Sequence, residues 1–109
     1  MSGHDVVKVI FVCDGITEHT LGSVVRQVRA VPKVPAGHED WQGPGLQVET
    51  DTEGRLVKLI GVCPTCRKRG DPRREEMRWS RVRKLLDAAE TLPKRELIGR
   101  IGQFNAILP

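Results

Sequence analysis

Three cysteines stand at two turns of the chain, and their spacing is that of metal-binding thiolates. Cys63 and Cys66 form a CPTC segment directly after an apolar run that ends at Val62. Two thiolates separated by two residues can point into one tight turn, where backbone amides hydrogen-bond to the sulfurs. One such pair supplies half of a tetrahedral zinc site, so the other half must come from a second turn.

Cys13 lies at such a second turn, because it follows the apolar run from Val6 to Val12. His19 comes six residues later, at the far end of the same turn. If the two apolar strands are neighbours, their ends meet at one end of a sheet. We therefore predict a structural Zn²⁺ bound by Cys13, His19, Cys63 and Cys66. The alternatives to His19 as the fourth ligand are His38, His4 and Asp14.

This arrangement resembles the zinc-ribbon and treble-clef families over residues 6–70. The segment from Cys63 to Cys66 matches the CPxC pattern of the family, with Arg67 where a glycine is usual. The first half departs from the pattern, because five residues separate Cys13 from His19 where the family has two to four. The resemblance implies one zinc ion clamped by two turns on β-hairpins.

Two other metal or thiol chemistries fit parts of the same residues. CPTC followed by Arg67 and Lys68 resembles the active-site motif of glutaredoxins, in which nearby cations lower a thiol pKa. That motif normally follows the first strand, whereas only 43 residues remain here after Cys66. "CDG" with a nearby histidine resembles the CDGSH iron-sulfur proteins, but His19 is three residues late and the upstream cysteine pair is missing. Inert buried thiols are the remaining interpretation.

The positions of apolar residues predict four strands before residue 63. Val6–Val12 is rich in β-branched residues, and residues 23–31 form a second valine-rich segment. Residues 32–45 are rich in proline and glycine, which predicts a loop with Trp41 folded back over the sheet. Residues 46–50 and 55–62 predict a hairpin, with Gly54 in its turn.

Two helices are predicted for the C-terminal part. Asp71 and Pro72 are typical of a helix start, and an apolar face recurs up to about Glu90 at Trp79, Val82, Leu85, Leu86 and Ala89. Pro93 opens a second helix with Leu97, Ile101, Phe104 and Leu108 on one face. The predicted fold is α+β: a small antiparallel zinc-ribbon-like module in residues 1–70, with two helices in residues 71–109 packed on it as one compact unit.

The positive charge is concentrated in residues 67–84, which hold nine basic and three acidic residues. On the predicted helix the basic side chains gather on one flank, and they continue the basic residues at the second cysteine turn. The set is Arg67, Lys68, Arg69, Arg73, Arg74, Arg78, Arg81 and Lys84. A basic stripe suits the phosphate backbone of a nucleic acid. There are two alternative interpretations of the basic residues. They bind an acidic protein partner, for example in the transcription machinery, or they form a solvated face without a partner.

Several function classes are disfavoured by the sequence. No apolar run approaches the roughly 18 residues of a membrane span, and no targeting signal is visible, so we expect a cytoplasmic protein. No nucleophile and base stand in a recognisable arrangement, and four protein ligands leave zinc no open position for a catalytic water. We therefore expect a small non-enzymatic protein with no small-molecule substrate.

Overall fold

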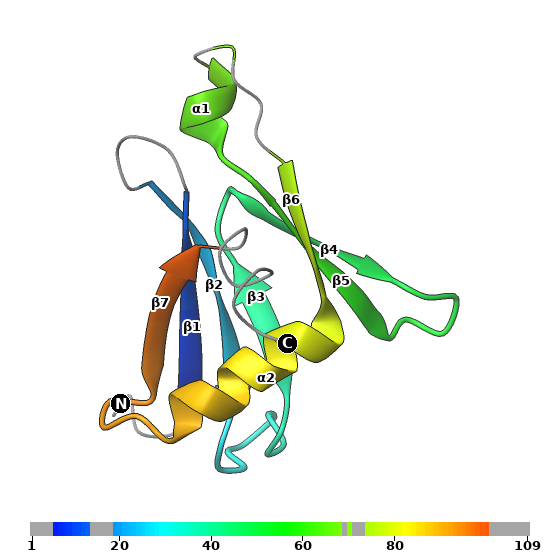
Figure 1. Cartoon of the computed structure of the whole chain (residues 1–109). Coiled ribbons are helices and arrows are strands. Elements are labelled where there is room, and N and C mark those ends of the chain that lie inside the picture. The colour runs from blue at the N-terminus through cyan, green and yellow to red at the C-terminus, as the bar shows by residue number, and fades with distance from the viewer. Residues whose placement is uncertain (1–5, 14–18, 69, 71–73, 101–109) are drawn as a thin grey trace.

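The computed structural model describes residues 6–13, 19–68, 70 and 74–100, and this part of the chain is mostly β (Figure 1). Seven strands form two sheets, and one longer and one short helix accompany them within the described residues. The prediction of a small ribbon module followed by two C-terminal helices is therefore wrong. The corrections concern mainly residues 74–100, whose extended segments complete both sheets.

The first sheet has the order β3-β2-β1-β7. Its strands are β1 (Val6–Val12), β2 (Thr20–Gln27), β3 (Glu39–Gln42) and β7 (Glu96–Arg100). β1 pairs with β2 antiparallel and with β7 parallel, so it is a central strand. Alternate residues of β1, namely Val7, Val9 and Phe11, are fully buried. This period of two places one face of the sheet on the core.

The second sheet is antiparallel and has the order β4-β5-β6. Its strands are β4 (Leu46–Thr50), β5 (Leu56–Val62) and β6 (Arg74–Arg78). Leu59 and Met77 are paired across β5 and β6 and are both buried in the core that the two sheets share. The opposite face carries charge, since Lys58 contacts both Glu49 and Glu76 there.

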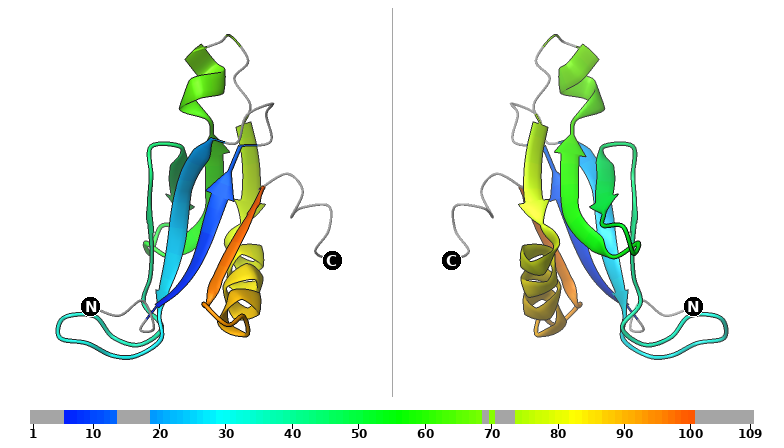
Figure 2. Two further views of the ribbon diagram at one scale, coloured as in Figure 1. Left: turned by 90° about the vertical axis from the view of Figure 1, so that its left-hand side faces the viewer. Right: turned by 90° about the vertical axis from the view of Figure 1, so that its right-hand side faces the viewer.

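Helix α2 (Trp79–Glu90) covers the core that the sheets share, and it contacts β1, β5, β6 and β7. It crosses one end of the first sheet, while the short helix α1 (Pro64–Lys68) lies at the opposite end of the molecule (Figures 1 and 2). The predicted apolar face of this helix is confirmed: Trp79, Val82, Leu85, Leu86 and Ala89 are all buried.

The helix begins at Trp79, eight residues after the predicted start at Asp71. Residues 74–78 form a strand instead, which pairs with the edge of β5 that β4 leaves open. Met77 points into the core while its neighbours Glu76 and Arg78 are exposed. An unpaired sheet edge carries unsatisfied backbone groups, so pairing overrides the local helix signals. Asp71 and Pro72 lie outside the described residues.

The second predicted helix is replaced by β7, which adds to the free edge of β1 in parallel. Leu97 pairs with Val9 and packs against the core, whereas Ile98 is 60 % exposed. Within the described residues, a strand therefore stands where the first turns of this helix were predicted. Ile101, Phe104 and Leu108 lie outside the described residues.

Two smaller corrections concern the middle of the chain. The second strand is Thr20–Gln27 and ends before residue 31. Part of the predicted loop is β3, which pairs with β2 at the sheet edge. Trp41 lies on this strand and is 36 % exposed, so it does not fold back over the sheet.

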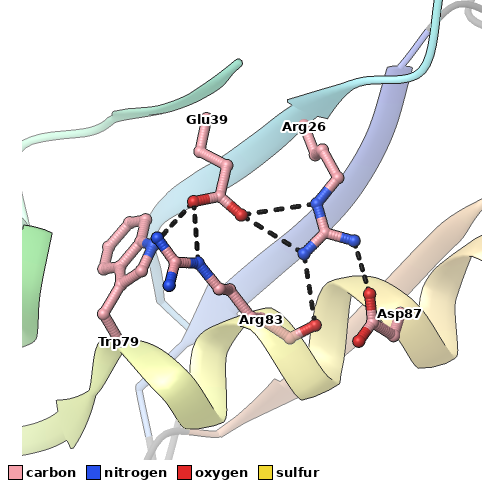
Figure 3. Close-up of polar contacts among 5 residues, drawn as sticks. All are labelled: Arg26, Glu39, Trp79, Arg83 and Asp87. Carbon is pink, nitrogen blue, oxygen red and sulfur yellow. Dashed lines mark hydrogen bonds and ion pairs between the residues drawn. The ribbon is translucent and has the colours of Figure 1, made fainter. Parts of the chain in front are cut away.

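Glu39 of β3 ties this edge strand to α2 (Figure 3). Its carboxylate accepts hydrogen bonds from Trp79 Nε1 at 2.9 Å, from Arg83 Nε at 3.2 Å and from the Arg26 guanidinium at 3.2 and 3.3 Å. Arg26 also contacts Asp87 on the helix, at 2.5 Å. Burial alone would raise the pKa of Glu39, but these donors outweigh it and hold the pKa below its ordinary value.

Candidate metal centre

The first half of the predicted metal site is formed at the end of the β1–β2 hairpin. Cys13 directly follows β1, and His19 directly precedes β2. The backbone N–H of Cys13 donates a hydrogen bond to the carbonyl oxygen of His19, with the nitrogen and oxygen 2.7 Å apart. This bond makes the two residues neighbours across the hairpin. The five intervening residues therefore do not separate the two ligands in space.

The second half is formed where β5 runs into helix α1. Cys63 follows the last residue of β5, and Cys66 lies within α1. The N–H of Arg67 donates to the carbonyl oxygen of Cys63 at 3.0 Å and closes the turn. The N–H of Cys66 points at the Cys63 sulfur, 3.5 Å away. This amide-to-sulfur contact is the one expected for a CxxC turn that holds a metal.

Gly45 joins the two halves, and nothing in our sequence analysis assigned it this role. Its N–H donates to the carbonyl oxygen of Leu21 at 2.9 Å, and its own carbonyl accepts from the N–H of Val62 at 2.8 Å. Leu21 is two residues after His19, and Val62 is one residue before Cys63. The glycines around Pro44 were visible in the sequence only as signals for a loop.

Gly43 and Gly22 allow two segments of the chain to cross closely at this junction. A Cβ on Gly43 would stand 2.3 Å from the Cα of Gly22 and 2.5 Å from the carbonyl oxygen of Leu21. Backbone atoms cannot move aside as easily as side-chain ends can, so a larger residue there would force the two segments apart. The close crossing holds the end of the β1–β2 hairpin against the end of β5.

The four predicted ligands come together as one cluster. The ligand atoms of Cys13, His19, Cys63 and Cys66 all lie within 4.8 Å of one another. The sulfurs of Cys13 and Cys66 are 3.4 Å apart, and His19 Nδ1 is 3.4 Å from the Cys63 sulfur. A tetrahedral zinc with Zn–S bonds of about 2.3 Å separates its sulfurs by about 3.8 Å. The donor set and its spacing therefore fit a tetrahedral metal ion.

The sulfurs of Cys13 and Cys66 are not joined in a disulfide in this structure, because bonded sulfurs lie about 2.05 Å apart. Each of the three cysteines is buried and at most 7 % exposed, and His19 is half-buried. Reactive redox cysteines are typically accessible to their substrates. Deep burial of all three thiols therefore disfavours the glutaredoxin-like interpretation.

His38, the alternative ligand that falls within the described residues, does not join this cluster. His38 is exposed, and its carbonyl accepts a hydrogen bond from Gln27, the last residue of β2. His19 stands at the other end of that strand, so the length of β2 separates the two histidines. His4 and Asp14 lie outside the described residues.

The thiols of Cys63 and Cys66 have unequal pKa values because their surroundings act on them in opposite directions. Burial would raise the pKa of Cys63, but hydrogen bonds from the backbone N–H of Cys66, from the other two thiols and from His19 outweigh it and lower the pKa to about 7. The hydrogen bond with Cys13, followed by burial, raises the pKa of Cys66 to about 11. Adjacent thiolates repel one another, and a bound cation would offset this repulsion.

The predicted basic stripe does not lie on one helix. Arg67 and Lys68 belong to α1, Arg74 and Arg78 to β6, and Arg81 and Lys84 to α2. Arg69 and Arg73 lie outside the described residues. The structure does bring Arg67, Lys68 and Arg74 together around one recess beside the Cys/His cluster.

Comparisons with protein-family models, with curated proteins and with solved structures find no match for this chain. Among the described residues, no helix is both long and apolar enough to cross a membrane.

Proposed function

We propose that this protein is a non-enzymatic module whose fold is stabilised by one structural zinc ion. The observation that supports it is the cluster of Cys13, His19, Cys63 and Cys66, with ligand atoms within 4.8 Å of one another. Three soft thiolates and an imidazole favour zinc over magnesium or calcium, which prefer oxygen ligands. Four protein ligands fill a tetrahedral shell, which supports a structural role over a catalytic one.

Native mass spectrometry of the intact chain tests the proposal. We expect one zinc ion per chain, removable with a chelator, together with a large loss of thermal stability, because structural zinc contributes roughly 10 to 16 kcal/mol in small zinc peptides. His19→Ala should weaken zinc binding strongly. The exposed His38→Ala should leave it unchanged and serves as the matched control.

A well-folded protein that takes up no zinc when zinc is supplied would overturn the proposal. Absorption spectra after cobalt substitution give an independent check. Tetrahedral thiolate coordination should give sulfur-to-metal charge-transfer bands that weaken in Cys63→Ser. An iron-sulfur cluster would instead produce visible absorption and bound iron and sulfide in the purified protein.

A second proposed function is binding of nucleic acid through its phosphate backbone. It is supported by the convergence of Arg67, Lys68 and Arg74 from two elements at one recess. An acidic protein partner would use the same cations. Affinity for generic single-stranded or duplex DNA should fall steeply between 50 and 200 mM salt, on the order of 10-fold or more for a few phosphate contacts. No binding at low salt would exclude this function.

A further inference from the structure

A recess of about 580 Å³ lies directly beside the Cys/His cluster. Its volume falls within the roughly 300 to 1,000 Å³ of small-molecule pockets. The described residues that line it are Pro44, Gln47, Val62, Pro64, Arg67, Lys68 and Arg74. Three of these side chains are cationic, one is an amide, and the others form apolar walls. The lining is therefore suited to a ligand in which an anionic group is attached to a small apolar or ring-shaped group.

The cations come from different parts of the sequence, so the fold itself brings them together. Arg67 and Lys68 lie on the exposed side of α1, the helix that carries Cys66. Arg74 lies on β6, directly opposite Val62 of β5. Val62 precedes Cys63. The two walls of the recess, α1 and the β5–β6 pair, are therefore both attached to the Cys63–Cys66 half of the Cys/His cluster.

Arg74 can serve an anion even though it already has a partner. Its Nε and Nη2 contact the carboxylate of Glu76 at 3.1 and 2.9 Å. A guanidinium has five N–H donors in a fixed plane, so this ion pair occupies one edge and orients the group. Among the described residues that line the recess, none is a carboxylate. Glu76 thus holds Arg74 in place from outside.

We propose that this recess is a phosphate-binding site, with Arg67, Lys68 and Arg74 as its ligands. Arginine pairs with two phosphate oxygens at once, and lysine adds a point charge. The proposal deepens the nucleic-acid function and rests on it, since it replaces a diffuse basic stripe with one defined site. The phosphate can belong to a strand of nucleic acid or to a free nucleotide.

The competing explanation is that the cations serve the metal centre alone. Zinc bound by three thiolates carries a net charge of about −1, and nearby cations would offset it. Under that explanation Arg67 and Lys68 stabilise bound zinc and bind no external anion. The two explanations predict opposite behaviour of the same variants, so one experiment separates them.

The experiment uses the zinc-loaded full chain and NMR titration with adenosine monophosphate and with inorganic phosphate. We expect shifts confined to the amides of Gln47, Val62 and Arg74 and of the α1 residues. A parallel arm measures the affinity of a short oligodeoxythymidine with and without a 5′-phosphate. The variants are Arg67→Gln with Lys68→Gln, and Arg74→Gln. Lys94→Gln, an exposed cation in the turn before β7, is the matched control.

We expect each recess variant to weaken phosphate binding at least about 10-fold while native mass still shows one zinc per chain. The Lys94 control should bind as the unchanged protein does. A preference for the 5′-phosphorylated strand or the nucleotide identifies a terminal phosphate as the ligand, and equal binding of both strands identifies the backbone.

Zinc-loaded protein that shows no shift with any phosphate overturns this proposal and leaves the zinc proposal intact. Variants that lose zinc but bind phosphate normally also overturn it and favour the charge-offset explanation. A chain that holds no zinc would instead count against the proposed zinc module itself.

Discussion

At the scale of single residues, Glu39 is the described carboxylate whose environment differs most from water. Its side chain is only 10 % exposed, and it accepts hydrogen bonds from two arginines and one indole. These donors favour the ionised form and offset the cost of burial. Because Arg83 and Trp79 belong to α2, the same contacts fix the helix against the edge of the first sheet.

Glu39→Gln should therefore lower the free energy of unfolding by about 1 to 3 kcal/mol at pH 7. The folded pKa of Glu39 lies below its ordinary value of 4.5, so its stabilisation is complete above that value and is lost as the pH falls through the folded pKa. The difference between the two proteins should thus shrink on acidification. Urea unfolding between pH 7 and pH 3 measures it.

The exposed Glu53→Gln provides the control for this series, since it should change the free energy of unfolding by less than about 0.5 kcal/mol at any pH. A Glu39→Gln difference that stays constant from pH 7 to pH 3 would contradict the assigned role of the ionised carboxylate.

At the scale of secondary-structure elements, the meeting of the two halves of the Cys/His cluster depends on the close crossing of chain segments at residues 43–45. Gly43→Ala should destabilise the protein by about 2 to 3 kcal/mol and weaken zinc binding, because its Cβ would collide with backbone atoms of Gly22 and Leu21. Gly43 also has φ of +126°, which disfavours alanine. Thermal unfolding and native mass measure the two effects.

Gly54→Ala is the matched control for this crossing. Gly54 also has a positive φ, of +81°, but an added Cβ would meet no atom within 4 Å among the described residues. It should cost only about 1 kcal/mol of backbone strain and leave zinc bound. Equal effects of the two substitutions would show that the close crossing does not matter.

At the scale of the whole molecule, residues 74–100 complete both sheets and the core. They supply six of the sixteen residues in the buried core cluster: Met77, Trp79, Val82, Leu85, Leu86 and Ala89. Each large buried apolar side chain contributes roughly 1.5 to 3 kcal/mol. The cysteines and His19 all precede residue 71, so the candidate metal ligands and much of the core lie in different parts of the chain.

A fragment of residues 1–70 should therefore bind zinc weakly and fail to fold cooperatively, because β1 and β5 would lose their partners β7 and β6. The full chain with zinc is the reference. The dispersion of ¹H–¹⁵N NMR signals and the shape of the urea transition measure the outcome. A fragment with dispersed signals and a sharp transition would show that the zinc-binding part is an independent module.

The features predicted best from the sequence are those that depend on residue type and on the spacing at which apolar residues recur. Thiolate and imidazole chemistry with CxxC spacing predicted that Cys13, Cys63 and Cys66 meet, and the position of His19 at the end of the same turn predicted the fourth member of the cluster. The apolar face of α2 follows from a repeat of 3.6 residues, which no strand reproduces. The approximate positions of β1, β4 and β5 also follow from their apolar runs between turn residues.

Tertiary structure alone decided which segments pair. Residues 74–78 and 96–100 carry local signals that fit a helix, but the open edges of β5 and β1 need partners for their backbone groups, and this need outweighs weak propensities. The same pairing placed Arg74 opposite Val62 beside Arg67, and the crossing at Gly45 brought the two cysteine turns together. The residue types alone determine which side chains are able to bind a metal. Whether distant side chains meet depends on backbone hydrogen bonds that no local sequence pattern specifies.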